Sequence, residues 1–198
     1  MAKHIGYHNA LKLAKETLEG RDPNLVASGA GVVWTGVDYE IPWMGDHVLL
    51  EEGEIDEQII WLHYLAANGP KRTSGVYINY KQVPGAAIYN ENFVKRTINP
   101  MVKAFQDSPD EFLKLGCEMG GEPQKSGNAS FTVRALPYIP LTCIIWQGDD
   151  EIPANGNILF DSTAPLWFCA EDLVALAGMV VYKMLKLVAL KSAHYRLS

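Results

Sequence analysis

Three consecutive carboxylates, Asp149, Asp150 and Glu151, form the densest group of reactive side chains in this sequence. They follow an apolar run that ends at Trp146, and Asp161 follows the next apolar run. The ends of buried strands are positions where functional residues commonly gather. Adjacent carboxylates repel one another, so such a turn requires a cation, a basic partner or full solvation. These four acidic residues form a candidate site, for which a solvated turn with a hydrogen-bonded Asp161 is the alternative.

His63 is the second candidate, because it stands within a strongly apolar helical pattern. It directly follows Leu62 and lies one turn after Ile59. An imidazole buried there needs a hydrogen-bond partner, and its titration range suits a proton shuttle or a ligand contact. The alternative is a structural histidine whose ring nitrogens are hydrogen-bonded within the core. Tyr64 joins the candidates through the motif described below.

Sequence patterns of known catalytic or cofactor sites are incomplete. Trp34 stands where a dinucleotide-binding loop that starts at Gly29 needs its third glycine. His4 and His8 could share a helical face as metal ligands, but they have no third partner nearby in the sequence. The three cysteines form no CxxC pair. The sequence therefore identifies no metal site, no cofactor and no catalytic residue.

Composition narrows the classes of partner. The net charge is -6 and the basic residues are scattered, which argues against nucleic acids and against acidic membrane surfaces as partners. The apolar stretch 173–190 is about as long as a membrane span, but Lys183 and Lys186 interrupt it, so a buried helix is predicted. Free thiols fit a reducing compartment, and we expect a cytoplasmic protein with a single globular domain over residues 1–198.

These candidate residues must be positioned by a mixture of helices and strands. Helical patterns with suitable ends occur at about 7–19, 54–67, 91–98, 108–120 and 171–192. Strands are expected at 76–80, 131–135, 141–146 and 158–160, with two or three antiparallel strands within 25–50. Because this order lacks regular βαβ alternation, it favours an α+β fold. We expect a mixed, mainly antiparallel sheet packed against several helices, with a long C-terminal helix.

Several motifs together resemble an uncharacterised domain family of anaerobic bacteria and archaea. The motifs are LHYL at 62–65, a Gly-Pro stop at 69–70, a Pro-Gly turn at 84–85, Tyr89, WQGDDEIP at 146–153 and LFD at 159–161. The resemblance spans about residues 55–175. It implies no activity and no catalytic residues. Some members are fused to iron-sulfur modules of the corrinoid and one-carbon type, but this chain has no such cysteine cluster.

Three functions are compatible with these residues. The first is a small-molecule or partner-binding module in anaerobic metabolism, with a cleft where the His63 helix meets the loop 148–153. The second is an enzyme in which His63 shares acid-base work with one of the carboxylates at 149–151 or Asp161. That enzyme requires the imidazole within hydrogen-bond reach of the carboxylate, or one water away. The third is a structural homo-oligomeric subunit that dimerises through an exposed face of its C-terminal helix.

Overall fold

The computed structural model describes the backbone of residues 2–195 and the side chains of residues 6–192. His4, weighed above as a metal ligand, lies outside the described side chains. Every strand pair in this range is antiparallel. One sheet has the order β1 (Val33–Trp34), β2 (Tyr39–Trp43), β3 (Asp46–Leu49). The other has the order β4 (Tyr77–Asn79), β8 (Asn155–Asp161), β7 (Ile139–Trp146), β6 (Ala129–Leu136), β5 (Glu122–Pro123).

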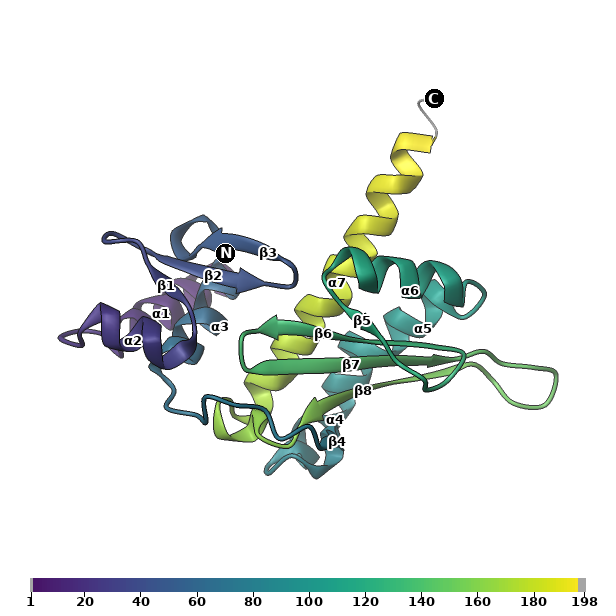
Figure 1. Ribbon diagram of the computed structural model, residues 1–198. Helices are drawn as coiled ribbons and strands as arrows, with labels where there is room; N and C mark the ends of the chain where they lie inside the picture. The colour runs from purple at the N-terminus through teal and green to yellow at the C-terminus, as the bar shows by residue number, and fades with distance from the viewer. Residues whose placement is uncertain (1, 196–198) are drawn as a thin grey trace.

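Helices surround these sheets (Figure 1). They are α1 (Ala2–Glu16), α2 (Pro23–Ala30), α3 (Ile55–Ala66), α4 (Ala86–Phe93), α5 (Asn99–Phe105), α6 (Pro109–Glu118) and α7 (Ala170–Tyr195). Helices α4–α7 lie on one face of the five-stranded sheet, whereas α1–α3 gather with the three-stranded sheet. The predicted α+β class, the antiparallel sheet and the long C-terminal helix are confirmed.

Helix α3 forms where the sequence predicts it, and it begins with a capping interaction. The carboxylate of Glu57 accepts the backbone N–H of Glu54 at 3.0 Å, which satisfies a donor that the first turn leaves open. One side of the helix is deeply buried, with Trp61 and Leu65 almost fully covered. His63 lies toward the other side and is half-buried. The helix therefore presents its histidine at the edge of the core.

The segment 25–50 is only partly β structure, because residues 23–30 form α2. Asp22 accepts the backbone N–H of Asn24 at 2.9 Å, and Pro23 occupies the first turn. Gly31 ends the helix in the left-handed conformation, with a φ of 71°. The β-favouring Val26 packs from this helix into the core. Local capping signals here outweigh the weak β preference of one valine.

The helix predicted at 91–98 instead runs as α4, a π-helical turn (Val94–Ile98) and α5 without a break. Pro100 explains the irregular turn, since a proline ring clashes with the carbonyl of the residue four positions earlier in an α-helix. Thr97 donates its hydroxyl to the carbonyl of Phe93 at 2.6 Å within this turn. Asn99 is itself helical, so the winding changes there without a break in the helix.

Helix α7 crosses the whole molecule and its far end projects from the body (Figure 1). Its first half is core, with Leu173, Leu176 and Val180 fully buried. Toward the C-terminal end the apolar side chains become exposed, and Leu190 retains 60% of its accessible surface. Length and composition would let α7 span a bilayer, although the core helices of soluble proteins meet the same criteria. The predicted burial is therefore correct for its first half only.

Candidate functional site

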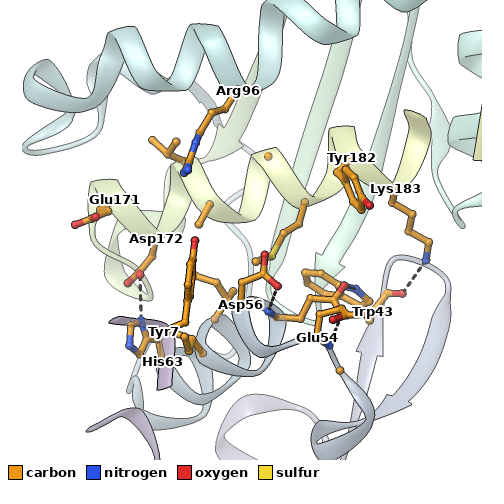
Figure 2. A pocket seen from close by; sticks show the side chains of 18 of the residues that line it. Tyr7, Trp43, Glu54, Asp56, His63, Arg96, Glu171, Asp172, Tyr182 and Lys183 are labelled. Carbon is orange, nitrogen blue, oxygen red and sulfur yellow. Dashed lines mark hydrogen bonds and ion pairs between the residues drawn. The ribbon is translucent and has the colours of Figure 1, made fainter. Parts of the chain in front are cut away.

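A cleft of about 1580 Å³ runs along the uncovered face of α7 (Figure 2). One wall comes from α1, the β2–β3 turn and α3, and the other from α4 and the π-helical turn. The side chains that line these walls include Tyr7, Trp43, His63, Tyr89 and Arg96. Segments from distant parts of the sequence therefore enclose one surface of α7.

His63 and Asp172 form a hydrogen-bonded pair at one end of the cleft. Nδ1 of the imidazole lies 3.0 Å from Oδ1 of the carboxylate. This hydrogen bond raises the pKa of His63 and outweighs the opposing effect of partial burial. An ionised carboxylate can only accept, so Nδ1 carries a proton and Nε2 is left for another partner. The pair can therefore bind a ligand or transfer a proton through Nε2.

Cys169 completes this cluster without becoming a nucleophile. Its Sγ donates to the other oxygen of Asp172 at 3.3 Å, so the carboxylate stands between thiol and imidazole. Partial burial and the adjacent carboxylate raise the pKa of Cys169. A thiol is activated by a neighbouring base or cation, and here it faces an anion instead. Cys169 therefore remains a protonated donor to Asp172.

Acidic side chains predominate around the cleft. The carboxylates that line it are Asp46, Glu52, Glu54, Asp56, Glu57, Glu171 and Asp172, and the permanent cations are Arg96, Lys183 and Lys186. Lys183 is already engaged, because its Nζ donates to the carbonyl of Met44 at 3.0 Å and to Asp46 at 2.7 Å. Arg96 and Lys186 have no ion pair among the described side chains. The cleft thus carries a negative excess and keeps two cations available.

The floor of the cleft is apolar. Ala175, Gly178, Met179 and Tyr182 of α7 line it in successive turns. Tyr182 retains 67% of its accessible surface, and a Cβ added at Gly178 would meet no atom within 4 Å. Ala175, Gly178 and Met179 are partly buried, and Ala175 and Met179 also pack against the core, so Tyr182 is the most exposed residue of this stripe. The cleft is therefore an amphipathic groove, with an apolar floor between charged rims.

The acidic turn 149–151 does not contribute to this groove. Asp149 accepts the backbone N–H groups of Glu151 at 2.9 Å and Ile152 at 2.7 Å, and these bonds lower the pKa of Asp149. The turn follows the Trp146 end of β7, and Tyr138, at the start of β7, contacts the α3 residue next to His63. The eight residues of β7 separate the two ends by roughly 25 Å. Figure 1 shows the loop between β7 and β8 at the end of the sheet that is remote from α3.

The predicted cleft between the His63 helix and the loop 148–153 is therefore wrong. Asp150 and Glu151 are exposed on that loop, with no ion pair to any described residue. The turn is accordingly a self-capped hairpin end at the far edge of the sheet. The carboxylate that meets His63 is Asp172, so the acid-base pairing with the carboxylates 149–151 or Asp161 is also wrong.

Asp161 is a buried structural acceptor. Its carboxylate accepts the N–H and hydroxyl of Ser74, the N–H of Gly75, and the N–H and hydroxyl of Thr163, at 2.6–3.1 Å. Burial alone would raise the pKa of Asp161, but the hydrogen bonds from Thr163 and Ser74 outweigh it and lower the pKa. The residue joins the segment before β4 to the end of β8.

Tyr64 is also structural. It is fully buried, and its hydroxyl donates to the carbonyl of Ala30 at 2.8 Å and accepts the N–H of Tyr138 at 3.3 Å. Its ring stacks on Trp167 with a centroid distance of 4.7 Å. Burial strongly raises the pKa of Tyr64, so the phenol stays protonated. Of the six predicted site residues, only His63 lines the cleft.

The sequence signals for the remaining site residues were indirect. Asp172 stands in the first turn of α7, where an acidic residue is expected simply from the helix dipole. Its distance of 109 residues from His63 hides the pairing from any local pattern. Within the part of the chain described here, no three His, Cys, Asp or Glu side chains are arranged to hold a metal ion.

Comparison with known proteins identifies a family. A family model described as a domain of unknown function (DUF3786) matches residues 22–183. No curated protein and no solved structure matches the chain. The matched range contains His63, Asp172 and the floor of the cleft as far as Lys183, whereas α1 and the projecting end of α7 lie outside it.

Proposed function

The chain belongs to a family of domains whose function is unknown, and we propose that it is a binding module whose cleft takes a positively charged, amphipathic segment of a partner polypeptide. The sequence alone allows either a small molecule or a partner protein as the ligand, and this proposal selects the partner protein. It rests on one observation, the amphipathic groove that runs over the uncovered face of α7.

The size of the groove favours a polypeptide over a small ligand. Pockets for small ligands usually have volumes of about 300–1,000 Å³ and enclose most of the ligand. At about 1580 Å³ this groove is larger and open along one side. Helix-in-groove recognition uses apolar anchors at one-turn spacing, which the stripe on α7 offers.

The charges of the groove favour a basic occupant. Rim carboxylates such as Glu52, Glu54 and Asp56 are exposed beside the apolar floor. Charged groups at the rim of an interface mainly set specificity and the rate of association. An amphipathic helix with lysines beside its apolar face would match this arrangement, whereas an acidic helix would be repelled.

A titration with a defined peptide tests the proposal. We would add a synthetic helical peptide of leucine and lysine, about 18 residues long, to isotope-labelled protein and follow the amide signal of Gly178. Saturable shifts at Gly178 and Tyr182 are expected, with affinity that falls as salt is added. A leucine-glutamate peptide of the same pattern should not bind. Equal binding of both peptides, or of neither, would contradict the proposal.

Two variants with the same charge change locate the binding site. Glu52→Lys alters the rim of the groove and should weaken binding of the basic peptide several-fold. Glu151→Lys alters the distant hairpin loop and should leave the affinity unchanged. If both variants weaken binding equally, the peptide responds to net charge and the groove is not its site.

The hydrogen bond between Nδ1 of His63 and Asp172 favours a second candidate function, an enzyme that uses this pair for acid-base chemistry. A carboxylate on Nδ1 orients the ring and makes Nε2 a better base. Hydrolysis of an activated ester such as p-nitrophenyl acetate is a suitable probe of Nε2. The enzyme candidate predicts that His63→Gln removes hydrolysis above the solvent rate and that Asp172→Asn reduces it. Equal hydrolysis rates for the original protein, His63→Gln and Asp172→Asn would exclude an esterase activity of this pair.

The cellular setting remains part of the proposal. A cytoplasmic location and a role in anaerobic metabolism are consistent with the free thiols and the acidic net charge. Fractionation of cells that express the full chain would test the location, and recovery of the protein with membranes would contradict it.

A further inference from the structure

We propose that α1 is an autoinhibitory arm of the groove, which a partner helix must displace in order to bind. This inference rests on the proposed function, because it names the regulation of the same groove. The arm consists of α1 and the link 17–21, whereas the family model begins at residue 22. The arm therefore lies outside the matched range, although α1 lines the groove.

The first turns of α1 close one side of the groove. Gly6, Tyr7 and Ala10 line it. Figure 2 shows the side chain of Tyr7 extending from α1 toward α7, between His63 and Asp56 in this view. A helix that lay along the whole floor would need the space that the ring of Tyr7 takes. The arm therefore shortens the part of the groove that a partner can use.

Few contacts hold α1 to the rest of the chain. The helix packs on α3, and among its described side chains only Ala14 is buried, while Leu11 packs partly against the core. Nζ of Lys15 lies 2.8 Å from Oε1 of Glu51. Both side chains are exposed, and exposed ion pairs contribute little to stability. The arm is thus held weakly enough for a ligand to displace it.

The link after α1 has the features of a hinge. Residues 17–20 form turns, and Gly20 has a φ of 73°, in the left-handed region that favours glycine. At the far end of the link, Nη1 of Arg21 donates to the carbonyl of Ala66 at 3.0 Å, where α3 ends. The link is therefore fixed at this end, and α1 can turn about it.

The chemistry of α1 matches that of the proposed ligand. Its sequence contains three lysines and one glutamate. Its apolar side chains recur at helical spacing, at Tyr7, Ala10, Leu11 and Ala14. The helix is therefore itself basic and amphipathic. Basic groups on one wall of the groove repel a basic ligand, so release of the arm should raise the affinity for that ligand.

The size of the inhibition depends on how often the arm is open. A ligand that binds only the open form has an apparent dissociation constant equal to the intrinsic constant divided by the open fraction. An arm that is closed about 90% of the time therefore weakens binding about tenfold. An isolated helix of 15 residues is marginal in water, so α1 should lose its helical hydrogen bonds when it is displaced. Displacement is thus detectable at the amides of α1.

Hydrogen exchange of the full chain tests whether a ligand displaces the arm. The leucine-lysine peptide should accelerate exchange at the amides of Leu11 and Ala14 at least about fivefold once binding is saturated. The amide of Val26 in α2, which also packs on α3, is the control and should be unchanged. Slower or unchanged exchange in α1 would overturn the arm, because it would show that α1 stays in place as a fixed wall.

Two neighbouring substitutions test the inhibition without a change of charge. Ala14→Gln places a larger polar side chain at a position that is 2% exposed, so it should detach α1 and lower the dissociation constant of the peptide about tenfold. Leu13→Gln introduces the same residue at a position that is 63% exposed, and it should leave the constant unchanged. Poor folding of a variant would weaken binding, so a gain in affinity reports on the arm.

Two charge changes of equal size on α1 give an independent test. Lys15→Glu places a carboxylate against Glu51, so it should release the arm. Lys12 pairs with Glu16 of its own helix at 3.8 Å, so Lys12→Glu alters the net charge and leaves the contact with Glu51 intact. We expect Lys15→Glu to bind the peptide at least about threefold more tightly than Lys12→Glu. Equal affinities would reduce the effect to net charge and contradict an arm held through Glu51.

The outcomes also separate this inference from the proposed function. If the original chain and Ala14→Gln bind the leucine-lysine peptide equally, the arm is overturned and the binding module is kept. If Ala14→Gln binds more weakly, α1 is part of the binding surface and its inhibitory role is overturned. If no protein binds the peptide, both proposals fail. Tighter binding by Ala14→Gln, together with faster exchange in α1 of the original chain, supports the arm.

Discussion

His63 and Asp172 are separated by 109 residues in the chain, yet Nδ1 of one lies 3.0 Å from Oδ1 of the other. The pair joins the exposed edge of α3 to the first turn of α7, at one end of the groove. It therefore connects a wall of the groove to its floor through a contact whose strength depends on pH. The titration of His63 reports directly on that connection.

Replacement of Asp172 with asparagine should lower the pKa of His63 toward its ordinary value of 6.5. Because the pKa of His63 is higher in the folded chain than in the unfolded chain, the pairing stabilises the fold fully at pH values below the pKa of the unfolded chain. This stabilisation is lost as the pH rises through the pKa of the folded chain. Because the imidazole is about a third exposed, the contribution should stay below about 1 kcal/mol. Titration of the His63 ring signals by NMR in the original protein and in Asp172→Asn measures the shift. An unchanged pKa in Asp172→Asn would contradict the pairing.

Replacement of Asp161 with asparagine should be among the most damaging single changes. The carboxylate accepts five hydrogen bonds, and an amide can accept them only in part. We expect a loss of roughly 3 kcal/mol in the free energy of unfolding at pH 7. Since the pKa of Asp161 is lowered by folding, the difference from the original protein should shrink as pH falls through the folded value. Urea titrations at several pH values measure it, and Asp150→Asn is the exposed control.

Removal of the Tyr64 hydroxyl should destabilise the fold without affecting the groove. Tyr64→Phe leaves the buried carbonyl of Ala30 without its partner at a cost of about 1–3 kcal/mol. Tyr182→Phe, at an exposed position of the same residue type, should change stability by less than about 0.5 kcal/mol. Thermal unfolding of both variants tests the contrast. Equal midpoints would show that the Tyr64 hydroxyl is not needed for packing.

Asp149 and Asp150 are adjacent, and only the first should matter for the structure of the hairpin loop. Asp149→Ala removes the acceptor for the N–H groups of Glu151 and Ile152. Hydrogen exchange at those two amides should accelerate about tenfold, the factor that the loss of one net hydrogen bond allows. Asp150→Ala should leave the exchange rates unchanged. Equal acceleration in both variants would contradict the capping role of Asp149.

Elements with strong local signals were predictable from the sequence. The stripe of apolar residues and the acidic first turn locate α3, and the run at 141–146 lies within β7, whose residues are buried up to Ile145. The prediction of β structure from residue 25 onward is wrong for α2. Val26 favours a strand, but Asp22 and Pro23 form the start of a helix. Short helices depend on their caps more than on their composition, so a reading of apolar residues alone misses them.

The site was less predictable than the fold, because it depends on contacts between distant segments. His63 was recognisable as a polar residue in an apolar helix. Its partner was not, since the first turn of α7 resembles any acidic helix start. The cluster at 149–151 attracted attention by its density, yet its spacing suits a turn that caps itself. Density of charge along the chain and convergence of charge in space are independent properties.

The π-helical turn at Val94–Ile98 determines the rotational phase of everything that follows it. Each residue of a helix turns the side-chain direction by about 100°, so one residue more or less in this turn would rotate the helix surface by that angle. Arg96 stands inside the turn and lines the groove (Figure 2). A deletion within the turn but before Arg96 that made the segment regular would carry the guanidinium away from α7 and leave the sequence of the groove otherwise intact. The irregular winding thus sets the direction in which Arg96 points, which the identity of the residue alone does not specify.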